Sequence, residues 1–216
     1  MKILMLIYPG MTPLDMMGPL QVFSYWPGAE VQLVWKDLQP VTTDTAACIV
    51  PTHTFDSAEA NPDIVFVPGG TAPTFALMSD PETLEFLNSR AANAKWITSV
   101  CTGALVLGAA GLLQGYQATT HWAAVDLLEG LGASHTAGRY VIDRDRATGG
   151  GVTAGIDFGL ALVAEISGPE VAKQIQLAME YSPAPPFVSG TPAEADPEIV
   201  QRVVDGFSAS LAELQA

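Results

Sequence analysis

One cysteine of this chain stands where a nucleophile would be expected. Cys101 follows the apolar, β-prone run 96–100, and a small-residue, helix-favouring run, 102–107, begins directly after it. A strand, a one-residue corner and a helix hold a side chain out of both elements, as in a nucleophile elbow. The thiol would also lie near the positive end of a helix, which favours the thiolate. The pattern predicts a reactive thiol at Cys101.

Other cysteines and histidines carry weaker signals. Free cysteine is often a small buried hydrophobe, and we expect this of Cys48. The same alternative applies to Cys101, where the change from strand to helix favours reactivity. The two cysteines form no C-x-x-C pair, and the three histidines, at positions 53, 121 and 135, are scattered. The sequence therefore predicts reduced thiols, no disulfide framework and no metal site.

Composition limits the partners and the compartment. The 216 residues include 9 Lys and Arg against 23 Asp and Glu, a formal net charge of −14. Such a surface repels phosphates, so we expect neither nucleic acid nor an anionic membrane as partner. The apolar run 1–8 ends at Pro9-Gly10 and is too short for a signal sequence or a membrane span. We expect a cytoplasmic chain.

The elements that must position Cys101 are short apolar runs alternating with helical patterns. We expect strands at 2–7, 30–36, 46–50, 63–67, 95–100 and 139–143, with a weaker one at 117–120. Helical signals include a start at 79–82, a buried helix over 152–166, and a final helix from Asp196 with Ile199, Val203, Phe207, Leu211 and Leu214 at helical spacing. No linker or repeat divides the chain. The alternation predicts one doubly wound α/β domain over 1–216.

Four loops are expected to meet at the carboxyl edge of the sheet, where such folds place their sites. They are 9–15, 68–71, 101–103 and 148–151. The glycines at 149–151 lack the pattern of a phosphate-binding loop, so close backbone packing under a helix is the simpler interpretation. The proline-rich segment 182–191 is expected to be extended at the surface.

Several stretches together resemble the DJ-1/PfpI superfamily. They are LDMMGP at 14–19, VPGGT at 67–71, TSVCTG at 98–103, ATTHW at 118–122, TGGGVTAGIDF at 148–158 and LAMEYSPAPPF at 177–187. The resemblance covers almost the whole chain. It implies a flavodoxin-like three-layer α/β/α sandwich with a mostly parallel sheet, as in class I glutamine amidotransferases, and a homodimer in which 182–191 could touch the partner.

Within the superfamily, the chain is similar to enzymes that hydrate isocyanides to N-substituted formamides without metal or organic cofactor. The resemblance implies that the Cys101 thiolate adds to the terminal isocyanide carbon. Asp15, where most members carry glutamate, would be an acid with a raised pKa that donates a proton to that carbon. The alternative interpretation of Asp15 is an ordinary helix cap.

Further site residues follow from the same resemblance. The backbone amides of Gly70 and Thr102 would be oxyanion-type donors, with glycine at position 70 allowing close backbone approach to the sulfur or substrate. The Thr102 hydroxyl would either contact the site or simply begin a helix. His121 would line the site or be structural, and Val152 and Thr153 would lie near the cysteine.

Alternative functions remain open at this stage. Protease-like members of the superfamily place histidine directly after the cysteine, where this chain has Thr102. A glyoxalase or general hydrolase is disfavoured by the same residue and by Asp15 in place of glutamate. A redox or ligand sensor using the Cys101 thiol is the alternative from another class. An AraC-type regulator would need a helix-turn-helix domain, and the sequence shows no such segment.

Overall fold

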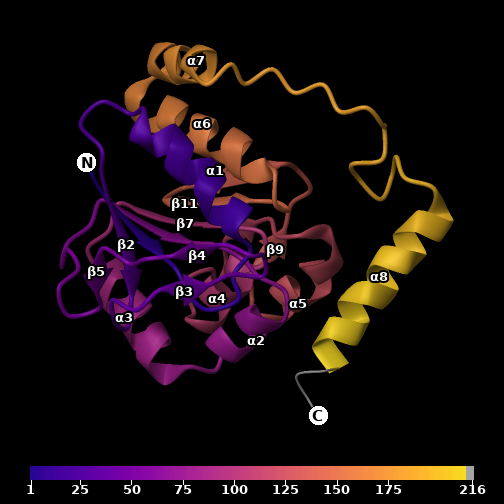
Figure 1. The fold of residues 1–216 in the computed structure, drawn as a ribbon, viewed down its shortest axis with the longest axis horizontal. Helices are drawn as coiled ribbons and strands as arrows, with labels where there is room; N and C mark the ends of the chain where they lie inside the picture. Colours follow the sequence, from indigo (N-terminus) through magenta and orange to yellow (C-terminus); the bar gives the residue numbers. More distant parts are fainter. Residues whose placement is uncertain (213–216) are drawn as a thin grey trace.

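A seven-stranded sheet forms the centre of the molecule (Figure 1). The computed structural model of the chain describes residues 1–212, with side chains up to residue 209. In spatial order the strands are β10 (Tyr140–Asp143), β11 (Arg146–Gly149), β7 (Trp96–Val100), β6 (Ile64–Val67), β1 (Lys2–Leu6), β2 (Glu30–Trp35) and β5 (His53–Thr54). Neighbouring strands run parallel except for β10 and β11.

Helices cover both faces of this sheet, as Figure 1 shows. On one face α1 (Pro13–Ser24) packs against α6 (Ala154–Ser167), which packs against α7 (Pro169–Ala178). On the other face α4 (Gly103–Ala109) contacts α2 (Ala72–Leu77), α3 (Pro81–Ala91) and α5 (Val125–Gly130). A 3-10 turn, Trp122–Ala124, precedes α5. These three layers with a mostly parallel sheet confirm the predicted flavodoxin-like fold class.

The central strands explain why the sheet has this form. All four residues of β6 are buried, and so are the last four of β7, because helices cover both sides. Parallel register places Val67 beside Ser99 and Val100 beside Gly149. The carboxyl ends of β6, β7 and β11 therefore lie next to one another, which brings their following loops together.

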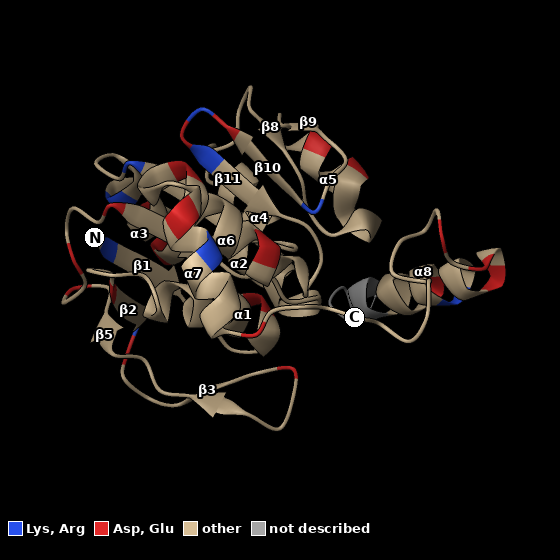
Figure 2. Ribbon diagram, turned by 90° about the horizontal axis from the view of Figure 1, so that it is seen from above, with Lys and Arg blue, Asp and Glu red and all other residues tan. Residues whose placement is uncertain are grey.

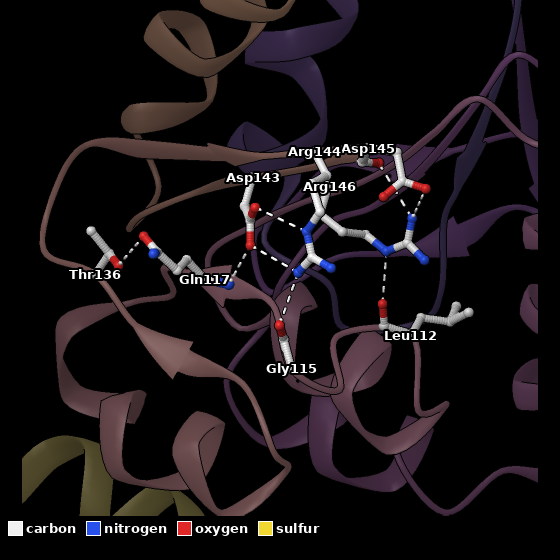
Figure 3. Close-up of polar contacts among 8 residues, drawn as sticks. All are labelled: Leu112, Gly115, Gln117, Thr136, Asp143, Arg144, Asp145 and Arg146. Carbon is white, nitrogen blue, oxygen red and sulfur yellow. Dashed lines mark hydrogen bonds and ion pairs between the residues drawn. The ribbon is translucent and has the colours of Figure 1, made fainter.

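Two arginines tie the β10–β11 hairpin to the rest of the molecule (Figure 3). Arg146 Nε donates a hydrogen bond to the Leu112 carbonyl at 2.7 Å, and Arg144 donates to the Gly115 carbonyl at 2.8 Å. Asp143 accepts from the Gln117 amide at 2.8 Å. These contacts fix the antiparallel hairpin to the segment that follows α4, so that β11 is held alongside β7.

Several sequence-based boundaries need correction. The expected strand 46–50 is only β4 (Cys48–Ile49), which pairs with β3 (Val41–Thr42) outside the main sheet. The weaker strand at 117–120 is β8 (Gln117–Ala118), paired with β9 (Ser134–His135). Strand β11 and helix α7 were not predicted. The residues of β11 are mostly small and show no clear hydrophobic pattern. The strand is buried because its neighbours and the covering helix α6 pack against it.

The helix expected over 152–166 is observed as α6, but it is buried on one face rather than on nearly every face. Its buried residues are Ala154, Gly155, Phe158, Gly159, Leu162 and Val163. The final helix is α8 (Pro197–Ala212). Its predicted position Leu214 lies outside the described residues, and the side chain of Leu211 is not described. Segment 182–191 is extended and exposed, as predicted.

Acidic side chains outnumber basic ones, at 23 against 9. Figure 2 shows acidic residues on many elements and few basic ones. Most of the Lys and Arg side chains form ion pairs; the paired ones are Lys2, Lys36, Lys95, Arg139, Arg144, Arg146 and Lys173. Little unpaired positive charge is therefore left on the described surface. None of the helices within residues 1–212 is long and apolar enough to cross a membrane.

Candidate active site

Cys101 occupies the predicted corner between β7 and α4. Its φ of 57° is in the left-handed region, which non-glycine residues seldom adopt. The surroundings fix this conformation on both sides. The Cys101 amide donates to the carbonyls of Gly149 at 3.1 Å and Gly150 at 2.9 Å, and the Cys101 carbonyl accepts from Thr120 Oγ1 at 2.9 Å. A strained residue held in this way is typical of functional sites.

Asp15 comes from the first turn of α1 and is completely buried. Its Oδ2 accepts a hydrogen bond from the Gly69 amide at 3.0 Å. That amide belongs to the loop after β6, so the carboxyl joins α1 to this loop and does not cap its own helix. The other oxygen, Oδ1, accepts no hydrogen bond from an N–H or O–H group in the described part of the chain. The Cys101 thiol interacts with this carboxyl and lowers its pKa.

Burial raises the pKa of Asp15 from 3.8 to about 7. The hydrogen bonds from Cys101 and the Gly69 amide lower the pKa against this burial, and the negative charge of Asp44 raises it. The expectation of a raised pKa is therefore confirmed, and desolvation by burial is its main cause. A carboxyl with a pKa of about 7 can donate or accept a proton near neutral pH.

The thiol differs from the sequence-based expectation. Burial raises the pKa of Cys101 above its ordinary value of 9.0, and the charge of Asp15 raises it further. Hydrogen bonds from the Thr102 and Val152 amides lower the pKa but do not overcome burial. The cysteine is 6% exposed, and desolvation of the thiolate outweighs the helix terminus. In the resting pair the proton therefore lies on the sulfur.

The Thr102 hydroxyl is part of a buried hydrogen-bond network. Thr102 Oγ1 donates to the Gly70 carbonyl at 2.8 Å and accepts from the Gly70 amide at 3.1 Å. Thr74 Oγ1 lies 3.0 Å from Thr102 Oγ1 and also donates to the Gly70 carbonyl. Tyr8, whose hydroxyl donates to the Pro68 carbonyl at 3.1 Å, contacts Thr74 as well. Thr102 is thus a link between α4 and the loop after β6, in addition to beginning a helix.

The expected pair of amides at the sulfur is revised by this network. The Thr102 amide lowers the pKa of the Cys101 thiol, whereas the Gly70 amide donates its hydrogen bond to the Thr102 hydroxyl. The second amide at the sulfur belongs to Val152, which the sequence placed only near the cysteine. Sequence reasoning missed this donor because it depends on how the loop after β11 turns toward β7.

Packing explains the two glycines after β6. A Cβ at Gly69 would lie 2.6 Å from the Thr102 nitrogen and 2.7 Å from Asp15 Oδ2. A Cβ at Gly70 would lie 2.9 Å from the Cα of Met11, on the side of the β1 loop. Packing against the β1 loop is therefore one reason for glycine at position 70, while the expected backbone approach to the sulfur or substrate stays a prediction. Gly69, which the sequence did not single out, is the glycine that makes room for the acid.

A cleft of about 500 Å³ is lined by the loop after β11, whose Gly150 carbonyl accepts from the Cys101 amide, but not by Cys101 or Asp15 themselves. The residues expected to line the site, His121, Val152 and Thr153, line it, together with Trp122 and Pro192. The His121 ring accepts a hydrogen bond from the Ala123 amide at 3.3 Å, and burial lowers its pKa. His121 is therefore both a structural cap of the 3-10 turn and a wall of the cleft.

The remaining cysteine and histidines lie apart from this centre. Cys48 is exposed, so its expected burial is wrong, because β4 pairs only with β3 at the surface. His53 is bonded to Thr52, and His135 lines the cleft from β9. The described residues include no cluster of three or more His, Cys, Asp or Glu that could hold a metal ion.

Comparisons with known proteins give a consistent result. A family model described as "DJ-1/PfpI family" matches residues 1–165. The chain is 51% identical over 195 residues to an isonitrile hydratase of Pseudomonas putida, covering 90% of this chain and 85% of that protein. It is 47% identical to a ThiJ/PfpI family protein from Pseudomonas syringae with a TM-score of 0.94, covering 99% of this chain and 89% of that structure. It is 36% identical over 115 residues to the HTH-type transcriptional regulator CdhR of Pseudomonas aeruginosa, covering 52% of this chain but only 34% of that protein.

Proposed function

The chain belongs to the DJ-1/PfpI family, and we propose that it is a lyase that hydrates isocyanides to N-substituted formamides. The observation that carries this proposal is the 51% identity, over 90% of the chain, to a protein named isonitrile hydratase, isonitrile being a synonym of isocyanide. The buried pair of Asp15 and Cys101 suits the chemistry, since an isocyanide needs a nucleophile and a proton at the same carbon.

In the first step the Cys101 sulfur attacks the terminal carbon of R–NC and a C–S bond forms. Asp15, ionised at the start, takes the thiol proton as the sulfur attacks and then delivers it to the same carbon. The product is a thioimidate, R–N=CH–S, on the enzyme. A carboxyl whose pKa burial raises to about 7 is suited to both transfers at neutral pH.

Water completes the reaction in the second step. Its oxygen bonds to the thioimidate carbon, one proton passes to the nitrogen, and Asp15 accepts the other. The C–S bond then breaks, the formamide R–NH–CHO leaves, and the sulfur recovers its proton from Asp15. The amides of Thr102 and Val152 stabilise negative charge on the departing sulfur, an effect of about 3 kcal/mol for a well-placed donor.

The same geometry weighs against the alternatives. A Cys-His enzyme needs an imidazole next to the sulfur; the residue after Cys101 is Thr102, whose hydroxyl is bonded to Gly70, and the His121 ring bonds to the Ala123 amide. A redox sensor needs a thiolate-rich, accessible cysteine. Cys101 is 6% exposed, and burial raises its pKa.

Partners and compartment follow as part of the proposal. The substrate is a small neutral molecule, which the acidic surface does not repel. We propose a homodimer because members of this superfamily usually dimerise. We propose the cytoplasm because the reaction requires a reduced Cys101, and reducing conditions there keep thiols free.

The test is formamide formation from an aryl isocyanide, followed spectroscopically with the full chain. Cys101→Ala is expected to abolish turnover while leaving the circular dichroism spectrum unchanged. Cys48→Ala is the matched control, because that thiol is exposed and lies on strand β4 outside the main sheet, and it should retain wild-type rates. Turnover by the Cys101→Ala variant, or none by wild type with its thiol reduced, would contradict the proposal.

A further inference from the structure

Residues 181–212, which follow α7 and end with helix α8, form an arm over the cleft. After α7, segment 182–190 is irregular and exposed, a turn follows in which the amides of Glu194 and Ala195 donate to the Thr191 carbonyl, and helix α8, which begins after this turn, lies apart from the sheet layers (Figure 1). Among the residues of α8 whose side chains are described, up to residue 209, a single stripe is partly buried, formed by Val200, Val204 and Phe207. Their spacing of four and three residues places them on one face of the helix. The arm therefore contacts the body along a narrow line.

Contacts of the arm with the cleft occur at three places along its length. At its start, Tyr181 donates a hydrogen bond to Asp157 at 3.1 Å, and Asp157 accepts from Arg139 at 2.6 Å. Arg139 lines the cleft and also donates to Thr153 Oγ1 at 3.3 Å. In its middle, residues 190–192 line the cleft together with the loop after β11.

The third contact joins α8 to the wall of the cleft. The Phe207 ring stacks on the His121 ring, with centroids 6.0 Å apart and planes 10° from parallel. His121 also lies against Gly151, where a Cβ would be 2.7 Å from His121 Cδ2. Gly151 directly precedes Val152, whose amide bonds to the Cys101 sulfur. The imidazole is thus held between the arm and the loop that supports the nucleophile.

We propose that the arm is the outer wall of the substrate cleft and selects R groups by size, an inference that rests on the proposed isocyanide hydratase function. Thr191 contributes directly, because it lines the cleft from the arm. Phe207 is a positioning residue that acts through His121. The volume of about 500 Å³ is within the range of small-molecule sites, so the arm restricts a space large enough for an aromatic R group.

The first test narrows the wall. Thr191→Trp is compared with Val188→Trp, a matched control in the same extended segment that is 78% exposed and does not line the cleft. We expect Thr191→Trp to lower kcat/KM for 2-naphthyl isocyanide by about tenfold, with less than about a twofold change for methyl isocyanide. Val188→Trp should change neither. An equal effect of the two variants on the ratio of the substrates would overturn the inference.

The second test removes the ring that stacks on His121. Phe207→Ala should lower KM for 2-naphthyl isocyanide relative to methyl isocyanide by about threefold or more, with kcat for methyl isocyanide within about twofold. Phe207→Tyr keeps a ring against His121 and should behave as wild type. Val203→Ala, a half-exposed position of the same helix, is the control for loss of helix packing. A KM ratio unchanged by Phe207→Ala, or changed equally by Val203→Ala, would contradict the positioning role.

A readout without turnover separates this inference from the proposed function. Alkylation of Cys101 by iodoacetamide and by N-(1-pyrenyl)maleimide is followed by mass spectrometry of its peptide, so that exposed Cys48 does not interfere. Thr191→Trp should slow the pyrenyl reagent about tenfold and leave iodoacetamide unchanged. If wild type hydrates no isocyanide, the hydratase proposal fails, but the alkylation rates still show whether the arm restricts access to Cys101 by size. Unchanged reagent selectivity in both Thr191→Trp and Phe207→Ala would overturn the proposal that the arm selects by size, even if turnover is normal.

Discussion

Replacing Asp15 by asparagine should make the protein more stable and much less active. The carboxyl is completely buried, and burial raises its pKa from 3.8 to about 7. At about 1.36 kcal/mol for each pH unit, this corresponds to an upper limit of about 4 kcal/mol between the two protonation states. The asparagine side chain keeps the shape and an oxygen for the Gly69 amide but carries no charge.

The sign of the stability effect follows from proton binding. Between pH 3.8 and about 7 the folded protein retains a proton on Asp15 that the unfolded chain has released, so wild-type stability falls as pH rises through this window. Asp15→Asn lacks this loss. Its free energy of unfolding should match that of wild type near pH 4 and exceed it above about pH 7 by up to about 4 kcal/mol. Urea unfolding at about pH 4.5 and about pH 8 measures the difference.

Activity should change in the opposite direction. Loss of a general acid and base lowers kcat by about 10²- to 10⁴-fold. In wild type the reactive pair holds one proton on Cys101 and Asp15 together, so kcat/KM should rise with pH up to about 7 and then level. This limb should be absent from Asp15→Asn. Asp44→Asn is the control: it removes the charge that raises the pKa of Asp15, so the limb should move to lower pH with kcat retained. An Asp15→Asn variant that is less stable than wild type at about pH 8, or that keeps the limb near pH 7, would refute the reasoning.

Two further substitutions test the loop after β6. Thr102→Val leaves the buried amide and carbonyl of Gly70 without their hydroxyl partner, and should lower the free energy of unfolding by about 1–3 kcal/mol in urea titrations. Thr102→Ser should restore it, and equal stability of the valine variant would show that the network is dispensable. Gly69→Ala places a methyl group 2.7 Å from Asp15 Oδ2, so kcat should fall by about tenfold or more and the acid limb of the pH profile should move. Gly130→Ala is the glycine control, since a Cβ there has no neighbour within 4 Å, and an unchanged profile for Gly69→Ala would argue against close packing at the acid.

The elements around the nucleophile were predictable because their signals are local. The change from an apolar run to small residues at Cys101 is visible in the sequence, and it corresponds to the observed end of β7 and start of α4. The continuous apolar run of β6 likewise predicted a strand buried on both faces. In both cases neighbouring residues are sufficient to define the element.

Other features depend on distant parts of the chain and were missed or misjudged. Strand β11 has small residues whose burial comes from β7 and α6, so its own pattern is weak. The thiolate was expected at the helix start, but the pKa of Cys101 depends on desolvation by several loops. The Val152 amide and Gly69 gain their roles only when those loops meet. The resemblance to a known family placed Asp15 beside Cys101, which spacing alone does not do.

The left-handed backbone at Cys101 has a consequence for how this chain can change over generations. Glycine would adopt φ 57° without cost, whereas a residue with a Cβ gives up about 1–2 kcal/mol there. Asp15, which interacts with this cysteine, imposes a further penalty on the folded state through its buried charge. Selection for stability alone would favour glycine at position 101 and a neutral side chain at position 15. The presence of both residues in one chain therefore indicates selection for chemistry, because each of them lowers the stability of the folded protein.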